Sequence, residues 1–412
     1  MNEFDVVIIG GGLVGATLAL CLLKQADSAG VAKLNIAVIE AHPMNISATG
    51  AARYTPSYDA RTSALANGTV ELFDTLNVWQ PMREHACPIE HIHVSEVGGF
   101  GVTRIHAEEE KIPALGYVVE NHWMGAVLNS ALAEHAASAS IRYLAPAQVS
   151  SWRYLAPGEG INLQVSSHGK TESLNAKLVV AADGATSSFR EMLGINAETH
   201  DYGQSAIVTN FTASKPHAGW AFERFTANGP IALLPLVDER MGLVWALPPE
   251  QAEQFANCSE AEFTHALLAQ IGDRIGTITR VGQRFVYPLK LVVAAEQVRP
   301  HCVILGNAAH ALHPVAGQGF NLSARDVRRL ADMILSKHAE QESFSSLAAL
   351  QHYLAIRETD QHNTTNFSHG LVKLFGRNEK ILHFGRNLGM ILFDLSPSGK
   401  KLLARHAMGR YA

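Results

Sequence analysis

The sequence predicts an α/β protein in which a parallel, dinucleotide-binding sheet is combined with an antiparallel β-sheet domain and C-terminal helices. The chain begins with a buried strand, a glycine-rich turn, a helix and a second buried strand, which is the order of a Rossmann-like βαβ unit. The stretch from Thr199 to Leu291 holds apolar runs typical of antiparallel strands: Ile231–Leu236, Gly242–Leu247 and Phe285–Leu289. A length of 412 residues favours two domains over one.

The first unit contains a G-x-G-x-x-G turn between two apolar strands. Its parts are, in order, the strand Phe4–Ile9, the glycines Gly10, Gly12 and Gly15, the helix Ala16–Lys24, and the strand Leu34–Ile39 with Glu40 at its end. The three glycines allow, in turn, a tight turn, the approach of a pyrophosphate, and close packing of helix on strand. Glu40 can accept the ribose hydroxyls and disfavours a 2′-phosphate, so FAD or NAD fits better than NADP. Glu40 lies later than the usual spacing, which predicts a longer helix–strand connection over residues 25–33.

Two later apolar strands also end in polar turns. The first is Leu178–Ala182, followed by Asp183, Gly184, Ser187 and Arg190. The second is Cys302–Leu305, followed by Gly306, Asn307, His313, Pro314, Gly317, Gln318 and Gly319. Apolar residues then recur with a helical period as far as Leu335.

These three motifs, in this order, resemble those of the class A flavoprotein monooxygenases, the fold family of para-hydroxybenzoate hydroxylase, over residues 4–335. Three further stretches resemble the ubiquinone-biosynthesis branch of that family: Tyr58–Arg61 with Ala64 and Leu65, Ala221–Phe225, and Gly385–Asn387. Asn307 stands where the wider family has Asp, and its amide can still hydrogen-bond a ribityl hydroxyl. The Asn favours the narrower branch.

The resemblance implies non-covalent FAD, NADH or NADPH as a transient reductant, and O2 that adds to the flavin as a C4a-hydroperoxide before an apolar prenylated phenol is hydroxylated. It places the pyrophosphate on the Gly10–Gly15 turn and the adenosine ribose on Glu40. Arg61 would face the pyrophosphate or the flavin edge, although a surface ion pair is the alternative. The remaining implied cofactor residues are Asp183, Asn307, Pro314, Gly317, Gln318 and Gly319. The helix that begins at this last turn would direct its positive end at the flavin ring.

The expected division is an FAD domain over residues 1–75, 110–190 and 295–335, a substrate sheet over 76–109 and 191–294, and a helical region over 336–412. Candidate substrate-pocket residues are Phe222, Phe225, Leu234, Pro235, Trp245 and His313. The apolar strand residues among them belong more often to a core than to a pocket. No residue is recognisable as a catalytic base. No second G-x-G-x-x-G follows a strand, so no separate nicotinamide domain is expected.

Composition excludes several other classes of protein. The net charge of −5 argues against nucleic-acid binding. The four cysteines are far apart and suggest neither disulfides nor a zinc site, and no metal is expected at His310 and His313 or at the set His85, Cys87, His91 and His93. A cytoplasmic protein is expected, because there is no basic leader and no long apolar run. The rival interpretations are a flavin halogenase or dehydrogenase, and a non-catalytic flavin-binding scaffold.

The C-terminal residues 371–412 differ from the rest of the chain in charge. They contain eight basic and two acidic residues, a net charge of +6. Apolar residues recur among them at helical spacing: Leu371, Leu374, Phe375, Ile381, Phe384, Leu388, Ile391, Leu392 and Phe393. This predicts an amphipathic helix that either packs on the body with its basic face in solvent or lies weakly against an anionic inner-membrane surface or a membrane-bound partner.

Overall fold

A mainly parallel sheet forms one end of the molecule, and the computed structural model describes residues 2–29, 32–43, 61–136, 141–376 and 379–396. Its strands are β1 (Glu3–Ile9), β2 (Ile36–Ile39), β8 (Ile141–Leu144), β9 (Gln148–Tyr154), β10 (Ile161–Ser167), β11 (Lys170–Ala181), β18 (Val298–Arg299) and β19 (Cys302–Ile304). The order is β18-β19-β11-β1-β2-β8, and β1 pairs in parallel with β2 and β11. The predicted parallel strands are confirmed, and their carboxyl ends meet at one edge.

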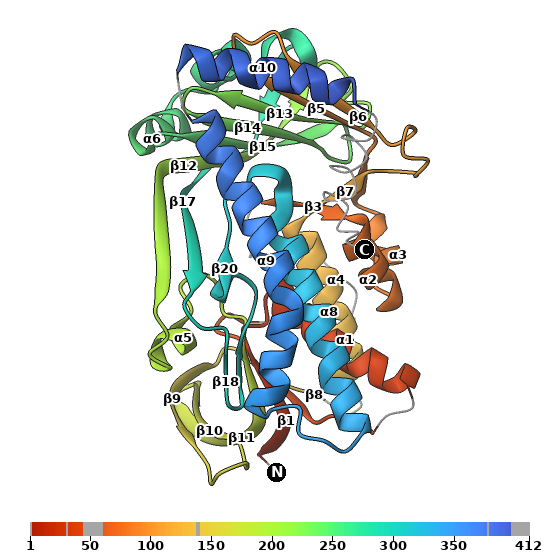
Figure 1. The fold of residues 1–412 in the computed structure, drawn as a ribbon, viewed down its shortest axis with the longest axis vertical. Helices are drawn as coiled ribbons and strands as arrows, with labels where there is room; N and C mark the ends of the chain where they lie inside the picture. Colours follow the sequence, from red (N-terminus) through yellow and green to blue (C-terminus); the bar gives the residue numbers. More distant parts are fainter. Residues whose placement is uncertain (1, 30–31, 44–60, 137–140, 377–378, 397–412) are drawn as a thin grey trace.

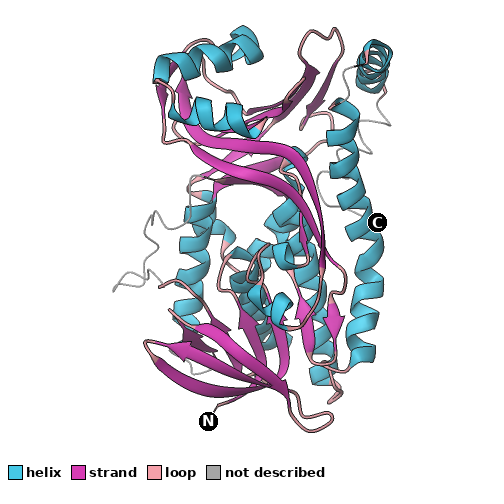
Figure 2. Cartoon of the chain, turned by 90° about the vertical axis from the view of Figure 1, so that its left-hand side faces the viewer, coloured by secondary structure: helices cyan, strands magenta, loops and turns pink. Residues whose placement is uncertain are grey.

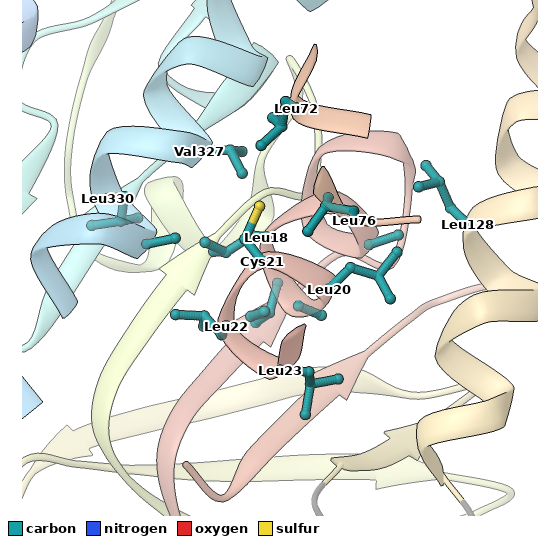
Figure 3. Close-up of a cluster of buried hydrophobic side chains, with 14 of the residues drawn as sticks. Leu18, Leu20, Cys21, Leu22, Leu23, Leu72, Leu76, Leu128, Val327 and Leu330 are labelled. Atoms are coloured by element: carbon teal, nitrogen blue, oxygen red, sulfur yellow. The ribbon is translucent and has the colours of Figure 1, made fainter. Parts of the chain in front are cut away.

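Helices cover one face of this sheet: α1 (Leu13–Ala29), α4 (Asn121–Ala136) and α8 (Gln318–Ala339). Figure 3 shows their contact, where Leu18 and Cys21 of α1 lie close to Val327 and Leu330 of α8. The other face is covered by β9, β10 and the short helix α5 (Ser188–Met192). Helix α1 extends to Ala29, beyond the predicted end at Lys24, so much of the expected connection after that residue is helical.

The second large sheet lies at the opposite end and is antiparallel apart from the pairing of β13 with β5 (Figures 1 and 2). Its strands are β5 (His91–Glu96), β6 (Val102–His106), β12 (Ala197–Ala213), β13 (Trp220–Thr226), β14 (Gly229–Pro235), β15 (Arg240–Leu247), β16 (Ile278–Val281), β17 (Phe285–Ala294) and β20 (His310–Ala311). The long strands β12 and β17 run from this sheet towards the parallel sheet (Figure 1). The predicted antiparallel sheet is therefore confirmed.

One face of the antiparallel sheet is buried under α6 (Pro249–Asn257), α7 (Glu260–Ile271) and the 3-10 turn η1 (Gly272–Ile275). The remaining elements form a small sheet with two helices: β3 (Thr62–Ala66), β4 (Ala86–Ile89), β7 (Gly116–Glu120), α2 (Asn67–Thr75) and α3 (Trp79–Arg83). Asn321 connects α8 to this part, because its Oδ1 accepts hydrogen bonds from the Ala66 N–H at 2.8 Å and the Thr69 hydroxyl at 2.9 Å.

The C-terminal region forms two helices, α9 (Leu347–Phe375) and α10 (Lys380–Asp394), where the sequence predicts one amphipathic segment. Figure 1 shows α9 along the length of the molecule and α10 across the outer end, on β6. Phe375 ends α9 by stacking on Phe225, with ring centroids 3.6 Å apart. Arg386, one of the eight basic residues of this region, is buried against Glu96. Four of the eight basic residues of the tail follow residue 396 and lie outside the described residues.

Candidate flavin and substrate site

A cavity of about 450 Å³ lies between the carboxyl edge of the parallel sheet and the open face of the antiparallel sheet. The parallel-sheet end is lined by turn residues: Gly12, Leu13, Val14, Ala182, Gly184, Asn307, Pro314, Ala316, Gly317 and Gly319. The antiparallel-sheet end is lined by strand residues, among them Ala221, Phe222, Glu223, Ala232, Leu234 and Val244. Its size is that of an ordinary small-molecule site.

The glycines of the first motif have different surroundings. A Cβ on Gly10 would lie 2.4 Å from the Ala182 carbonyl oxygen, and one on Gly15 would lie 1.9 Å from the Gly10 oxygen, so both glycines are required by the fold itself. A Cβ on Gly12 would meet no described atom within 4 Å and would project into the cavity. Glu40 lies beside this turn and accepts the Gly11 N–H at 2.7 Å. Of the three motif glycines, Gly12 is thus the one beside which the fold leaves open space.

The second and third motifs are joined by Arg190. Its guanidinium donates to the Ala308 carbonyl at 2.8 Å and to the Ala185 carbonyl at 3.1 Å, while its own N–H is accepted by the Ser187 hydroxyl at 3.0 Å. The loop that carries Asp183 and the loop that carries Asn307 are therefore held side by side. Asn307 is exposed, and it lines the cavity that both loops border.

The third motif forms the turn that begins α8. Ala316 and Gly317 both have a left-handed backbone, with φ of 61° and 60°. For Ala this conformation is unfavourable, and such backbone strain is concentrated at functional sites. The turn directs the N-terminus of a long helix towards the cavity, where its free N–H groups and positive dipole end favour a negatively charged group.

These residues fit FAD by observations that are independent of the motifs. Open space lies above Gly12 and Gly319, where a Cβ would meet no described atom within 4 Å. Two buried oxygens near the cavity, Oδ1 of Asp183 and Oε1 of Gln318, have no hydrogen-bond partner among the described residues. Buried polar atoms are normally paired, so both are available to an extended ligand that carries hydroxyl and amide donors.

Arg61 lines the same cavity and lies over the ring of Tyr287, with its Cζ 5.3 Å from the ring centroid. Its guanidinium therefore lies beside the cavity, and its contact with the pyrophosphate or the flavin edge stays a prediction. The preceding residues Tyr58, Asp59 and Ala60, which belong to the same family-like stretch, lie outside the described residues.

The structure divides the six candidate pocket residues into two groups. Phe222, Leu234 and His313 line the cavity. The other three lie elsewhere in the core: Phe225 packs on Phe375, Pro235 is buried, and Trp245 stacks on Phe255 at 5.2 Å beneath α6. For Pro235 and Trp245 the reason is the two-residue period of a strand, which places Leu234 and Val244 on the cavity face and their neighbours Pro235 and Trp245 on the opposite face. Phe225 shares the strand face of Glu223 but stacks on Phe375 of α9.

Two titratable groups in the wall have displaced pKa values. Burial lowers the pKa of His313 to about 4, so the imidazole is neutral, and its Nδ1 accepts the Val315 N–H at 3.2 Å. Burial raises the pKa of Glu223 to about 8, against a smaller opposite effect of the Ala316 N–H. Glu223 was not among the predicted site residues, although it lies within the family-like stretch Ala221–Phe225 and between two inward-facing apolar residues of the same strand.

Behind the cavity, a buried ionic network ties α8 to α9. Asp326 accepts hydrogen bonds from His310 at 2.7 Å and from Arg357 at 2.6 Å. Burial alone would raise the pKa of Asp326, but these two partners lower it below the ordinary value. His310 is therefore a structural residue next to the third motif. Among the described residues, no group of three His, Cys, Asp or Glu side chains is arranged to hold a metal ion, and all four cysteines are free.

Sequence comparison places the chain among flavoproteins of quinone biosynthesis. Residues 3–359 match the family described as FAD binding domain. The chain is 34% identical over 406 residues to ubiquinone hydroxylase UbiL of Rhodospirillum rubrum, covering 98% of this chain and 89% of the relative. It is 30% identical to 3-demethoxyubiquinol 3-hydroxylase of Escherichia coli, covering 98% of each chain. Identity to the human ubiquinone biosynthesis monooxygenase COQ6 is 28%.

Solved structures support the fold. The p-nitrophenol 4-monooxygenase PnpA of Pseudomonas putida superposes with a TM-score of 0.78 at 18% identity over the whole of both chains. PqsL of Pseudomonas aeruginosa superposes with a TM-score of 0.74 at 19% identity, covering 94% of this chain. With these matches, and with the three motifs gathered around one cavity, the chain belongs to the FAD binding domain family and is a class A flavoprotein monooxygenase of the ubiquinone-biosynthesis hydroxylases.

Proposed function

We propose that this monooxygenase hydroxylates the ring of a polyprenylated phenol, 2-polyprenyl-6-methoxyphenol, to the corresponding benzoquinol. The observation that carries the proposal is the single cavity that joins the flavin turn at Gly317 to the apolar strand residues Leu234 and Val244. A ring bound against that wall would lie next to the flavin, and its apolar chain would be desolvated by the same surface.

Bound FAD would supply the redox chemistry, taking electrons from NADH or NADPH and passing them to O2. The chain's own residues would do the positioning. Gly12 makes room for the pyrophosphate, and Asn307 would hold the ribityl chain. The N-terminus of α8 would stabilise negative charge on the flavin ring, and the sheet would exclude water from the reacting oxygen. In this scheme the parallel-sheet segments bind FAD and the antiparallel segments bind substrate.

The test is direct. The purified protein, saturated with FAD, is incubated with NADH or NADPH, O2 and a short-chain 2-prenyl-6-methoxyphenol, and the product is analysed by mass spectrometry. We expect one added oxygen atom per ring and roughly one equivalent of non-covalently bound FAD. If only unprenylated phenols were hydroxylated, the substrate would be a different, small phenol. Bound flavin without turnover of any phenol would favour a non-catalytic scaffold.

We further propose that the enzyme collects this substrate at an anionic membrane surface through one side of α10. Four large apolar side chains are exposed at spacings of four, four and three residues: Phe384 by 59%, Leu388 by 43%, Leu392 by 60% and Leu395 by 73%. Phe100 continues this stripe, with its ring centroid 5.8 Å from that of Phe384. Exposed apolar stripes of this kind occur where a protein meets a lipid or a partner.

The opposite side of α10 is fixed to the body, so the stripe has a defined orientation. Asn387 accepts the Gly101 N–H at 2.7 Å and donates to Glu96 at 2.9 Å. Residues 397–412, which follow the helix in the sequence, contain four basic and no acidic residues. This charge favours anionic lipid as the occupant of the surface, and each basic residue near such a surface contributes about 1 kcal/mol. No helix among the described residues has the length and hydropathy to cross a bilayer.

Flotation with vesicles that contain anionic lipid, at low and high salt, tests this surface. We expect the full chain to bind at low salt and to be released at high salt. Phe384→Glu combined with Leu392→Glu should abolish binding, whereas Ile356→Glu, at an exposed apolar residue of α9 outside the stripe, should not. The basic residues are tested by a variant with Lys400, Lys401, Arg405 and Arg410 changed to Glu. If this variant and the wild type both bind negligibly, lipid is excluded and the stripe would contact a protein partner.

A further inference from the structure

Glu223 is a carboxyl in the wall of the cavity, on the strand that faces the flavin turn. It lies in β13 directly opposite Ala232 of β14 and Val94 of β5, and all three project from the same face of the sheet. Ala221 and Leu234 of that face also line the cavity. The turn at Ala316, from which α8 begins, meets the carboxyl through its backbone N–H. Glu223 therefore stands between the apolar wall and the flavin turn.

Two other buried carboxyls of this region, Glu96 and Glu120, are held by hydrogen bonds to basic or amide side chains. Glu96 is buried and receives hydrogen bonds from Arg386 and Asn387. Glu120 is buried and is held by Arg240, with N–O distances of 3.1 and 3.0 Å to its two oxygens. Glu223 differs, because its Oε1 is buried and has no hydrogen-bond partner among the described residues. A carboxyl kept only for the fold would be paired, as these two are.

The surroundings of Glu223 give it the properties of a base for a phenol. Its neighbours on the sheet face, Val94 and Ala232, carry no charge. Among the described residues that line the cavity, the other ionisable groups are Arg61 and the neutral His313. Burial raises the pKa of Glu223 to about 8, which brings it closer to that of a phenol, near 10. Proton transfer is most effective when the two pKa values approach each other and the working pH.

We propose that Glu223 is a catalytic residue of the hydroxylation, the group that accepts the proton of the substrate's phenolic hydroxyl. This inference rests on the proposed phenolic substrate. As the proton passes to the carboxylate, an electron pair of the phenolic oxygen moves into the ring. The ring carbon then forms its bond to a hydroxyl group derived from O2. The oxygen–oxygen bond breaks, and its electron pair leaves with the second oxygen, which ends as water.

The remaining proton movements restore both the ring and the carboxylate. The dienone loses the proton of its newly hydroxylated carbon to water. Its carbonyl oxygen takes back the proton from Glu223. The two electrons that reduce O2 come from NADH or NADPH, as in any reaction of this class. Glu223 is thus returned to its starting form in each turnover.

The experiment compares the wild type with Glu223→Gln, both saturated with FAD, using 2-prenyl-6-methoxyphenol as the probe. We expect hydroxylation to fall about 10²–10³-fold in the variant. Flavin reduction should continue, so O2 should be converted to hydrogen peroxide in place of product. In the wild type, kcat/KM should rise with pH towards about 8, and this rise should be absent in the variant. Glu198→Gln, an exposed carboxyl on β12 of the same sheet, is the matched control and should behave as wild type.

A second probe separates chemistry from structure. A ring-fluorinated analogue that is already ionised at pH 8 needs no base, so the two proteins should hydroxylate it at rates within about tenfold of each other. Equal hydroxylation of the unfluorinated probe by wild type and Glu223→Gln would overturn the role of Glu223 and leave the proposed function intact. An equal loss with both probes would also overturn it, because it would indicate a structural role. Failure of the wild type itself would count against the proposed function.

Discussion

The two ends of the cavity are built in different ways. At the flavin end, the wall consists of main-chain turns at residues without a side chain, such as Gly12, Gly317 and Gly319. At the sheet end, the wall consists of side chains that alternate along strands, such as Leu234 and Val244. We therefore expect added side-chain atoms at the flavin end to block FAD binding. Single substitutions on the sheet face should change the substrate pocket and leave FAD binding intact.

The largest effect is expected at the flavin end. Gly12→Val should abolish FAD binding, weakening it at least about 100-fold, because the side chain would occupy the space of the pyrophosphate. The protein should still fold, since that space holds no described atom within 4 Å. Flavin absorbance after gel filtration and the thermal unfolding midpoint measure the two effects separately.

Gly15→Val provides the contrast within the same turn. Its Cβ would lie 1.9 Å from the Gly10 carbonyl oxygen, so this variant should lose folding as well as FAD. A complete flavin spectrum in Gly12→Val would refute the placement of the pyrophosphate, and a normally stable Gly15→Val would refute the assignment of that glycine to the fold.

The next effect distinguishes the two faces of the antiparallel sheet. Trp245→Ala should destabilise the protein by about 3–5 kcal/mol, because it removes a buried side chain that stacks on Phe255 under α6. Leu234→Ala, on the cavity face, should mainly raise KM for the prenylated probe, by about tenfold for the loss of a few buried methylene groups. Denaturant unfolding and steady-state kinetics are measured on both variants. A stable Trp245→Ala with a raised KM, or a Leu234→Ala that is destabilised with an unchanged KM, would contradict this assignment of the two faces.

A smaller effect concerns pH and stability. The folded chain holds the proton of Glu223 up to about pH 8, whereas the unfolded chain releases it near the ordinary value of 4.5. Between these values the folded state binds more protons, so its stability falls as pH rises. Glu223→Gln removes this contribution. We therefore expect the variant to unfold at a temperature about 2 °C or more above the wild type at pH 8, and at the same temperature near pH 4.5.

The sequence predicts the flavin end well because backbone geometry dictates residue type there. A turn that accepts a pyrophosphate needs glycine at fixed positions, and the strands before Gly10 and Asn307 are short buried runs. The sheet end is harder, because alternation shows that Val244 and Trp245 face opposite sides but does not show which side bears the cavity. Trp245 was one of the candidate pocket residues, yet its ring fills the core under α6.

The C-terminal region shows a different limit of sequence reasoning. Helical spacing from Leu371 to Phe393 correctly indicated apolar helix faces, but it could not reveal the break between α9 and α10. The count of eight basic residues includes Arg386, which is buried against Glu96 from a strand 290 residues away in sequence. Pairings across such separations leave no local signal.

The smallest effect is expected for Asn307→Asp, at the flavin end of the cavity. This side chain lines the flavin end of the cavity and is exposed. Asn307→Asp keeps an oxygen that can accept the hydrogen bond of a ribityl hydroxyl. FAD affinity should therefore change by no more than about threefold, less than the 1.4 kcal/mol of a tenfold change. Asn307→Leu, of similar size without a hydrogen-bonding atom, should weaken FAD by about tenfold, as the loss of one hydrogen bond to a desolvated hydroxyl predicts. Fluorescence titration of the apoprotein with FAD measures both variants. If Asp and Leu weaken FAD equally, the amide N–H of Asn307 is the group that matters, and the ribityl contact must be one in which the protein donates.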